Sequence, residues 1–542
     1  MEKDSLKPCL VQTSQGFSVK YKERLLYSKY NPAKNILTLV QKSTILPGTV
    51  ILCISPALNY GIREMAEKLP EDCLLLGIEL EEELFELSKS DPCKQLPDSI
   101  NFLRIPKDKI LFLPSKLEEM NHGEYKRCIR IDFSNGSNFH SDFYNQLYTA
   151  CQNSIGQFWK NRITLVKFGR RYAGNILKNL PLIEKSRPFF KVSKPIIVVG
   201  AGESAVKTLN LIKNQREHFF ILTVDAVLST LNAMNIISDA VICEEAQDII
   251  AGAFTGNKNQ AKYFFVSAST NQNVTKLYPS KNIFYATEYA KTGFFKKLEE
   301  SGIFENVIPP LGSVGLSAVE IALKLRKDES IPVYVTGLDF SFSKGCTHAK
   351  DSFHDKKRRN LSNRLNGIEN FGAAFSADSK AFSGKDGSIF YTNSTLFNYA
   401  ELFSYRFTKI KNLFDAGKTG LSLGLEQKTI SLPAKSADFP ENKNNAREIE
   451  LQHQKIKTFI ESEINALHEL KDIFTGKIKL EQQEREKRIL NLLSDREYLF
   501  IHFPDGYKLN LSQDFLNRIR IELDYFLKIL KKADSNYQLH YL

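Results

Sequence analysis

Short apolar segments, each followed by a helical stretch, recur through the middle of this chain and restrict its possible folds more than any other feature. Their residues are hydrophobic in succession and often β-branched, without the alternation of apolar and polar side chains typical of half-buried strands. Such segments form strands buried on both faces, as in a parallel sheet covered by helices. The predicted strands lie at 195–199, 219–224, 240–243, 263–266, 283–285 and 333–335. The chain is therefore predicted to be an α/β protein with a central, doubly wound, Rossmann-like parallel sheet.

A shorter version of the same pattern occurs near the N-terminus. Apolar strands are predicted at 49–54 and 73–78, with a glycine-poor turn at 55–61 and a helix between them. This pattern predicts an N-terminal Rossmann-like α/β domain over residues 1–185, followed by the central domain over 186–430.

The character of the sequence changes after about residue 430. A polar linker at 436–445 is followed by apolar residues at helical spacing, first over 449–474 and again over 515–530. The pattern predicts a helical C-terminal domain over residues 431–542. We interpret the apolar stripes as packing surfaces, and docking of a partner helix is the alternative.

Composition excludes several classes of protein. The eight cysteines form no CxxC pair, so neither a disulfide framework nor a zinc site is expected, and no metal ligands are assigned. The sequence shows no secretory signal and no membrane-spanning apolar stretch, so a cytoplasmic protein is expected. The net charge is +12, but its densest cluster, Lys356–Arg359, is short and accompanies no nucleic-acid-binding motif. An anionic small-molecule substrate suits this charge at least as well as a nucleic acid.

Two glycine turns open predicted helices. Gly200-Ala-Gly-Glu-Ser204 lies between a strand and a helix, where glycine lets the backbone approach a phosphate at the helix N-terminus. Asp225 ends the next strand, where an acid can bind a ribose hydroxyl. The GxGxxG fingerprint is incomplete because Ala205 takes its third glycine position, and a purely structural turn is the alternative. Gly312-Ser313 opens a second helix, which leads to a strand and then Asp339.

The order of these motifs resembles the motility accessory factor (Maf) family. The resemblance is carried by Val199-Gly-Ala-Gly-Glu-Ser204, by the helix that opens at Gly312-Ser-Val314, by Tyr334-Val-Thr-Gly-Leu-Asp-Phe340 and by Thr347-His-Ala349. Their order is also similar to bacterial sialyltransferases that use a cytidine-monophosphate (CMP) donor, and to archaeal (MptE-like) hydroxymethylpterin pyrophosphokinases. Outside this core, Asn175-Ile-Leu-Lys-Asn-Leu180 resembles the segment that precedes the Maf transferase domain.

The Maf resemblance implies a sialyltransferase-like fold and a glycosyltransferase that supports flagellar assembly and motility. Such an enzyme moves a nonulosonic acid, of pseudaminic or legionaminic type, from a CMP-activated donor to Ser or Thr of flagellin. It implies no obligatory cofactor, and whether a divalent metal takes part stays open. The implied donor-binding residues are Gly200, Ala201, Gly202, Glu203, Ser204, Asp225, Glu244, Ser267, Gly312 and Ser313. His348 is the implied general base, with His354 as its rival and Asp339 to orient the base or the acceptor.

Three residues depart from the family pattern. Glu203 would repel a phosphate unless its carboxylate points away, Ser341 stands where the sialyltransferases have a tyrosine, and Glu244 stands where an Asp is usual. Two other functions are therefore kept in view. One is a pyrophosphokinase that uses ATP and Mg²⁺, with Asp225, Glu244 and Asp339 as magnesium ligands. The other is a flagellin-binding accessory protein without catalysis.

Overall fold

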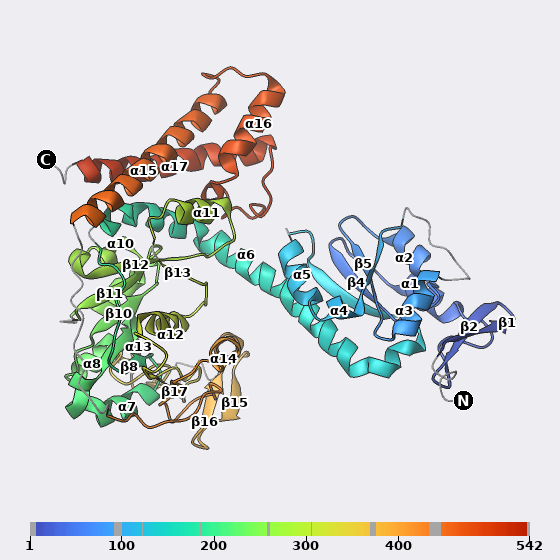
Figure 1. Cartoon of the computed structure of the whole chain (residues 1–542), viewed down its shortest axis with the longest axis horizontal. Helices are drawn as coiled ribbons and strands as arrows, with labels where there is room; N and C mark the ends of the chain where they lie inside the picture. Colours follow the sequence, from blue (N-terminus) through green and yellow to red (C-terminus); the bar gives the residue numbers. More distant parts are fainter. Residues whose placement is uncertain are drawn as a thin grey trace. The chain divides into compact units, whose positions relative to one another are not determined.

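The computed structural model describes residues 7–90, 100–121, 123–184, 186–256, 261–304, 306–368, 375–432 and 446–538. The chain forms two compact units, an N-terminal unit of Met1–Phe168 with Ile501–Leu509 and a second unit of Gly169–Phe500 with Asn510–Leu542. Each unit contains its own parallel sheet (Figure 1). The long helix α6 (Ser141–Ile183) belongs to both units, and the division into three domains stays a prediction.

The N-terminal unit contains a four-stranded parallel sheet in the order β6-β5-β4-β7. Its strands are β4 (Thr49–Ile54), β5 (Leu74–Ile78), β6 (Phe102–Ile105) and β7 (Arg127–Asp132). Every residue of β4 and β5 is buried, as the continuous apolar segments predicted. The helices of this unit, besides the first part of α6, are α1 (Lys34–Lys42), α2 (Ile62–Lys68), α3 (Glu82–Ser90), α4 (Lys107–Ile110) and α5 (Leu113–Met120). A small antiparallel sheet of β1 (Cys9–Thr13), β2 (Gly16–Tyr21) and β3 (Arg24–Leu25) precedes them.

The second unit contains an eight-stranded sheet in the order β13-β12-β11-β10-β9-β8-β14-β17, and all of its neighbouring strands run parallel. These strands are β8 (Ile196–Val199), β9 (Phe220–Val224), β10 (Ala240–Cys243), β11 (Tyr263–Ser267), β12 (Asn282–Thr287), β13 (Val307–Ile308), β14 (Val333–Thr336) and β17 (Leu413–Asp415). A separate antiparallel hairpin joins β15 (Lys380–Ser383) and β16 (Ile389–Thr392). The predicted α/β class and parallel central sheet are confirmed.

The order of these strands reverses between β8 and β14. From β8 the chain adds strands in one direction as far as β13, and it then returns to place β14 and β17 on the other side of β8. Right-handed crossovers in opposite directions put α7 (Ser204–Ile212) and α8 (Leu228–Ala233) on one face and α12 (Val314–Leu325) on the other (Figure 1). Open α/β sheets bind ligands at the carboxyl ends of the strands that flank such a switch point.

The other helices of the second unit complete the cover of the sheet and form the C-terminal part. They are α9 (Ala251–Phe254), α10 (Gln272–Thr275), α11 (Gly293–Glu300), α13 (Phe353–Leu361), α14 (Ser394–Phe407), α15 (Ala446–Phe474), α16 (Gln482–Leu493) and α17 (Gln513–Gln538). The predicted apolar stripe of α17 is buried at Phe515, Ile519, Leu523, Phe526 and Leu530. The stripe is therefore a packing surface, and it is not free to dock a partner helix.

The second half of α6 packs against α17. Arg170 Nε lies 2.7 Å from Glu522 Oε2, and the Arg170 guanidinium lies 3.7 Å from the centre of the Tyr525 ring. A Cβ atom at Gly174 would lie 3.2 Å from Tyr525 Oη, so this glycine permits the close approach. The C-terminal helices are therefore an integral part of the second unit.

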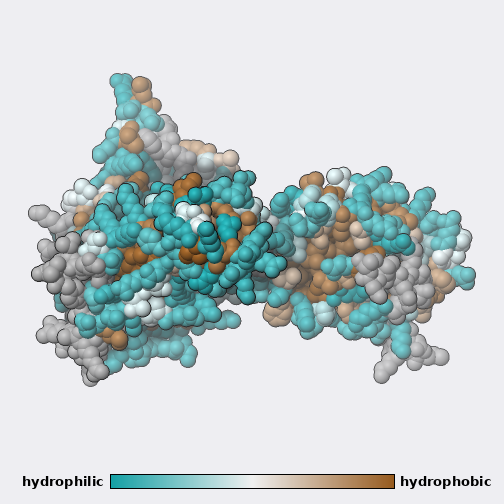
Figure 2. Space-filling model, turned by 90° about the horizontal axis from the view of Figure 1, so that it is seen from above, coloured by the Kyte–Doolittle hydropathy of each residue, from teal (hydrophilic) through white to brown (hydrophobic). Residues whose placement is uncertain are grey.

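The exposed surface seen in Figure 2 is mostly hydrophilic, with apolar side chains in separate patches. None of the helices in the described ranges combines the length and apolarity needed to cross a membrane.

Candidate functional site

The glycine turn after β8 meets the loop after β14 directly at the switch point. Gly200 N donates to Thr336 O and Gly202 N donates to Gly337 O, each at 2.8 Å. A Cβ atom at Gly200 would collide with Gly337 O, and Gly337 itself has φ +71°. The glycines are therefore required by the close approach of two protein backbones, as the structural interpretation of this turn expected.

Asp339 joins the same two segments through its buried carboxylate. One oxygen accepts from Ser204 N at 2.8 Å, and the Ser204 hydroxyl donates to the other oxygen. Gly337 N in turn donates to Ser204 Oγ at 2.8 Å. Burial raises the pKa of Asp339 to about 6, although both hydrogen bonds from Ser204 and the nearby Lys385 oppose this rise. The carboxylate thus occupies the N-terminus of α7, where the sequence predicted a phosphate.

Glu203 points away from the glycine turn. Its Oε1 accepts from Ser343 N at 2.8 Å and from Ser343 Oγ at 2.6 Å, in the loop that follows β14. The carboxylate therefore has its own partners, which removes the objection that it would face the donor. The buried Ser341 hydroxyl has no hydrogen-bond partner within the described part of the chain.

Asp225 stands at the carboxyl end of β9 with one oxygen unused. Its Oδ1 accepts from Ala226 N at 2.7 Å, whereas the buried Oδ2 has no hydrogen-bond partner among the residues that the structure describes. Burial raises the pKa of Asp225 to about 6, and the Cys243 thiol beside it opposes the rise. Buried polar atoms are almost always paired, so a free carboxylate oxygen here suits a ligand that donates a hydrogen bond.

Glu244 and Ser267 continue this carboxyl edge on the next two strands. Tyr285 Oη donates to Glu244 Oε1 at 2.9 Å, and Ser317 of α12 also bonds the carboxylate. Loss of contact with water raises the pKa of Glu244 to about 7. Ser267 Oγ lies 3.1 Å from Ser269 Oγ. Asp225, Glu244 and Ser267 therefore lie at the predicted edge, on three adjacent strands.

The start of α12 lies beside the first glycine turn. A Cβ atom at Gly315 and one at Gly200 would each lie 2.5 Å from the same atom, Leu338 Cδ2. Gly312 precedes this helix with φ +70°, and the N-cap Ser313 side chain makes no capping hydrogen bond. The two predicted turns therefore come together, and the N-terminus of α12, unlike that of α7, has no carboxylate bound to it among the described residues.

His348 is held in a loop that contacts the glycine turn. Ala349 N donates to Ala201 O at 2.7 Å, and Thr347 Oγ1 lies 3.0 Å from His348 Nδ1. The His354 ring stacks on the His348 ring, with centroids 4.4 Å apart. Burial, together with the charges of His354 and Arg358, lowers the pKa of His348 to about 4. His348 is therefore neutral near pH 7 and able to accept a proton.

Two asparagines of α6 that were given no role by the sequence analysis hold this edge together. Asn175 Nδ2 donates to Ala246 O at 3.1 Å and to Ser269 O at 2.9 Å. Asn179 Nδ2 donates to Ala268 O at 2.9 Å and to Thr270 O at 2.8 Å. These carbonyls belong to the loops after β10 and β11, next to Glu244 and Ser267. The signal in the sequence was a pair of asparagines spaced i, i+4 on an otherwise apolar helical face.

We predict that Asn179→Leu lowers the free energy of unfolding of the second unit by about 3 kcal/mol, because two buried carbonyls lose their donor. Hydrogen exchange should show faster exchange at 268–271. The control is Asn491→Leu at an exposed position of α16, where little change is expected. Unaltered exchange at 268–271 in Asn179→Leu would contradict the clamping role of α6.

The N-terminal sheet has the same kind of switch point, between β4 and β7. The acidic residue there, Glu79, already accepts hydrogen bonds from the protein at both carboxylate oxygens. Ser55 Oγ donates to Glu79 Oε2 at 2.6 Å, and the backbone N–H groups of Leu80 and Glu81 donate to Glu79 Oε1 at 2.9 and 3.0 Å. The protein's own groups therefore take the place of a ligand there, in keeping with the glycine-poor turn at 55–61. Among the described residues of the whole chain, no group of three or more His, Cys, Asp or Glu side chains is placed to hold a metal ion.

The fold is Rossmann-like, and its carboxyl-edge residues lie at the end of the larger sheet where open α/β sheets bind ligands. Residues 171–345 match the family model described as 6-hydroxymethylpterin diphosphokinase MptE-like. The fold is similar to that of the MAf glycosyltransferase from Magnetospirillum magneticum AMB-1, with a TM-score of 0.57 and 11% identity over 98% of this chain and 92% of that one. An uncharacterized protein of Treponema pallidum (strain Nichols) is 28% identical over 98% of this chain and 96% of its own length. The predicted resemblance is confirmed: the chain has a Maf-like fold with an MptE-like core.

Proposed function

We propose that this protein is a glycosyltransferase that moves a nonulosonic acid from a CMP-activated donor to Ser or Thr of flagellin in the cytoplasm. The observation that carries the proposal is the buried Asp225 Oδ2, which has only the Cys243 thiol beside it and no hydrogen-bond partner by geometry among the described residues. Asp225 follows β9, next to the strand β8 that leads into the Gly200 turn. An ionised oxygen of this kind accepts a hydrogen bond from a ribose or sugar hydroxyl. The likeness of nearly the whole chain to the Maf fold supports the same function.

The donor phosphate is proposed to bind at the N-terminus of α12. Asp339 already takes the backbone N–H of Ser204 at the start of α7, so a phosphate there would face a carboxylate. The Ser313 side chain makes no capping hydrogen bond at the start of α12, and the N-terminus of a helix presents backbone N–H groups to an anion. Ser313 would donate its hydroxyl to a phosphate oxygen.

The proposed chemistry is a displacement at the anomeric carbon. The acceptor hydroxyl oxygen forms a bond to this carbon, the bond to the phosphate oxygen breaks, and CMP leaves with the electron pair. His348 takes the proton of the acceptor hydroxyl and passes it to water. Asp339 is a positioning residue in this scheme, because it holds Ser204 and the glycine turn to which the His348 loop is bonded.

The direct test of this proposal uses purified flagellin. Incubation with the protein and CMP-pseudaminic or CMP-legionaminic acid should raise the intact mass of flagellin by one sugar residue or more. Unchanged flagellin mass with both donors would reject the transferase proposal. Flagellin binding without any mass change would favour a non-catalytic accessory protein.

We predict that Asp225→Asn weakens CMP or donor binding about tenfold or more, because a hydrogen bond to an ionised group is lost. Calorimetry measures the dissociation constant directly. Asp328→Asn is the control, since Asp328 is exposed and its carboxylate accepts from Ser330 N in the turn before β14. Equal affinities of wild type and Asp225→Asn would remove Asp225 from the donor site.

The match of residues 171–345 to the MptE-like family model favours one second candidate, a diphosphokinase that uses ATP and Mg²⁺. Asp225 and Glu244 directly follow adjacent strands, and the charge of Asp225 raises the pKa of Glu244, so a cation between them would relieve this repulsion. Calorimetry with ATP and Mg²⁺ against CMP separates the two candidates. Binding of ATP with Mg²⁺ but not of CMP would favour the diphosphokinase.

A further inference from the structure

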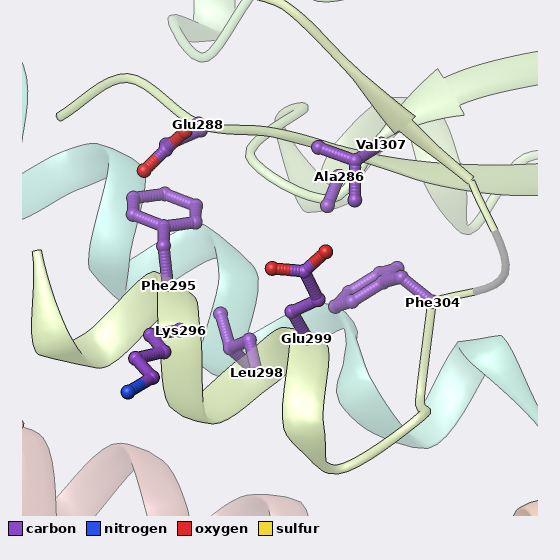
Figure 3. A pocket seen from close by; sticks show the side chains of 8 residues that line it. All are labelled: Ala286, Glu288, Phe295, Lys296, Leu298, Glu299, Phe304 and Val307. Atoms are coloured by element: carbon purple, nitrogen blue, oxygen red, sulfur yellow. The ribbon is translucent and has the colours of Figure 1, made fainter. Parts of the chain in front are cut away.

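A small cavity opens between α11 and the last two strands of the larger sheet. Its volume is about 90 Å³, and Figure 3 shows the side chains that surround it. Ala286 of β12 and Val307 of β13 are register partners and form one side, and Phe295 and Leu298 of α11 form the other. Phe304 closes one end. The cavity lies at β12 and β13, several strands from the β8–β14 switch point, so it is separate from the proposed donor site.

Two carboxylates accompany this apolar lining. Figure 3 shows the Glu299 carboxylate turned toward Ala286 and Val307, and the Glu288 carboxylate beside the Phe295 ring. Neither glutamate has an ion-pair partner within the described ranges of the chain. The one lysine of the lining, Lys296, points away from the cavity and pairs with Glu300 at 3.7 Å. The charge that faces the cavity is therefore negative, in a chain whose net charge is +12.

The lining combines groups that suit an organic cation with an apolar stem. The faces and edges of Phe295 and Phe304 pack against methylene groups, and aromatic rings also attract ammonium and guanidinium groups. Glu288 and Glu299 then supply acceptors at the rim, where a charged end group would remain partly in water. A volume of about 90 Å³ leaves room for one such side chain and is too small for a nucleotide.

The position of the cavity at the edge of the sheet indicates what kind of molecule carries this cation. β13 is the last strand in the order of the sheet, and it pairs with β12 alone among the described strands. Val307 on this edge strand is 38% exposed. A polypeptide can lie along such an edge and direct one side chain into an adjoining pocket. This geometry favours a side chain of a protein over a free amine.

We propose that the cavity binds a Lys or Arg side chain of a partner protein, with Glu288 and Glu299 as its anionic ligands. The proposal goes beyond the sugar-transfer function and does not depend on it. In an enzyme that modifies proteins, such a site would orient the acceptor by a residue other than the one that is modified.

Saturation-transfer NMR with the full chain and short capped peptides tests this proposal. The probes are acetyl-Gly-Lys-Gly-amide and acetyl-Gly-Arg-Gly-amide, and the matched control is acetyl-Gly-norleucine-Gly-amide, which keeps the stem without the charge. We expect the basic peptides to bind and the norleucine peptide to bind at least fivefold more weakly. Glu288→Gln and Glu299→Gln should each weaken the basic peptides about threefold, as for a partly exposed ion pair. Glu300→Gln, on the same helix but outside the lining, should leave their affinity unchanged.

Several results would overturn the proposal. They are the absence of binding by either basic peptide at millimolar concentration, equal binding of the norleucine peptide, or an effect of Glu300→Gln as large as that of Glu299→Gln. Binding of spermidine much tighter than the peptides would assign the cavity to a free polyamine instead. Because none of these measurements involves CMP or sugar transfer, failure of the donor-site proposal would leave this test intact.

Discussion

Replacing Asp339 with alanine should lower the free energy of unfolding of the second unit by about 4 kcal/mol and abolish its activity. The buried Asp339 carboxylate accepts from both the backbone N–H and the hydroxyl of Ser204, 135 positions earlier in the chain. Its removal leaves two buried donors without a partner, and each such group costs about 1–3 kcal/mol. The substitution also removes a negative charge from the N-terminus of α7, where such a charge is favourable.

Urea denaturation of the full chain, monitored by circular dichroism, measures this loss of stability in the second unit. Asp328→Ala at an exposed position is the control and should cost less than about 1 kcal/mol. The pair Asp339→Ala and Ser204→Ala should be strongly non-additive, with a coupling energy of about 1–3 kcal/mol. Additive losses would show that the two residues do not depend on each other.

Replacing His348 with glutamine should reduce the proposed transfer rate by a factor of about 10² to 10⁴, the usual contribution of a general base. CMP affinity should change little, because His348 is proposed to contact the acceptor hydroxyl and not the nucleotide. His354→Gln is the matched control, since it removes the stacked neighbour but keeps the proposed base. A larger loss in His354→Gln than in His348→Gln would exchange their roles.

The pH dependence of the wild-type rate gives an independent check on His348. Its pKa is lowered to about 4, so the ring is neutral and can accept a proton at every pH above about 5. As the pH falls, the rate should first decline through about pH 6, where the donor-binding Asp225 becomes protonated, and then decline more steeply below about pH 4, where the His348 ring is protonated as well. Initial rates of change in flagellin mass after brief pH jumps measure this profile. A profile without the second, steeper decline near pH 4 would argue against His348 as the base.

Local patterns in the sequence were sufficient for the strands and their polar ends. Ala240–Cys243 was predicted residue for residue, because an uninterrupted apolar run of this length has few alternatives beside a buried strand. Asp225 and Glu244 were placed at the carboxyl edge for the same reason, since each directly follows its strand. The buried stripe of α17 likewise follows from the helical spacing of its apolar residues.

The partners of the site residues were decided only by the tertiary structure. The sequence predicted a phosphate at Ser204. The order of strands places β14 beside β8, so the Asp339 carboxylate occupies that end of α7 instead. Asn175 and Asn179 donate to carbonyls 71 to 94 positions away in the sequence. These carbonyls lie in two loops that come together only when β10 and β11 pair. Hydrophobic periodicity is a property of neighbouring residues, so the sequence alone determined the elements and the residues at their ends. Hydrogen bonds between distant segments depend on which strands lie side by side, and that order is set by packing of the whole unit.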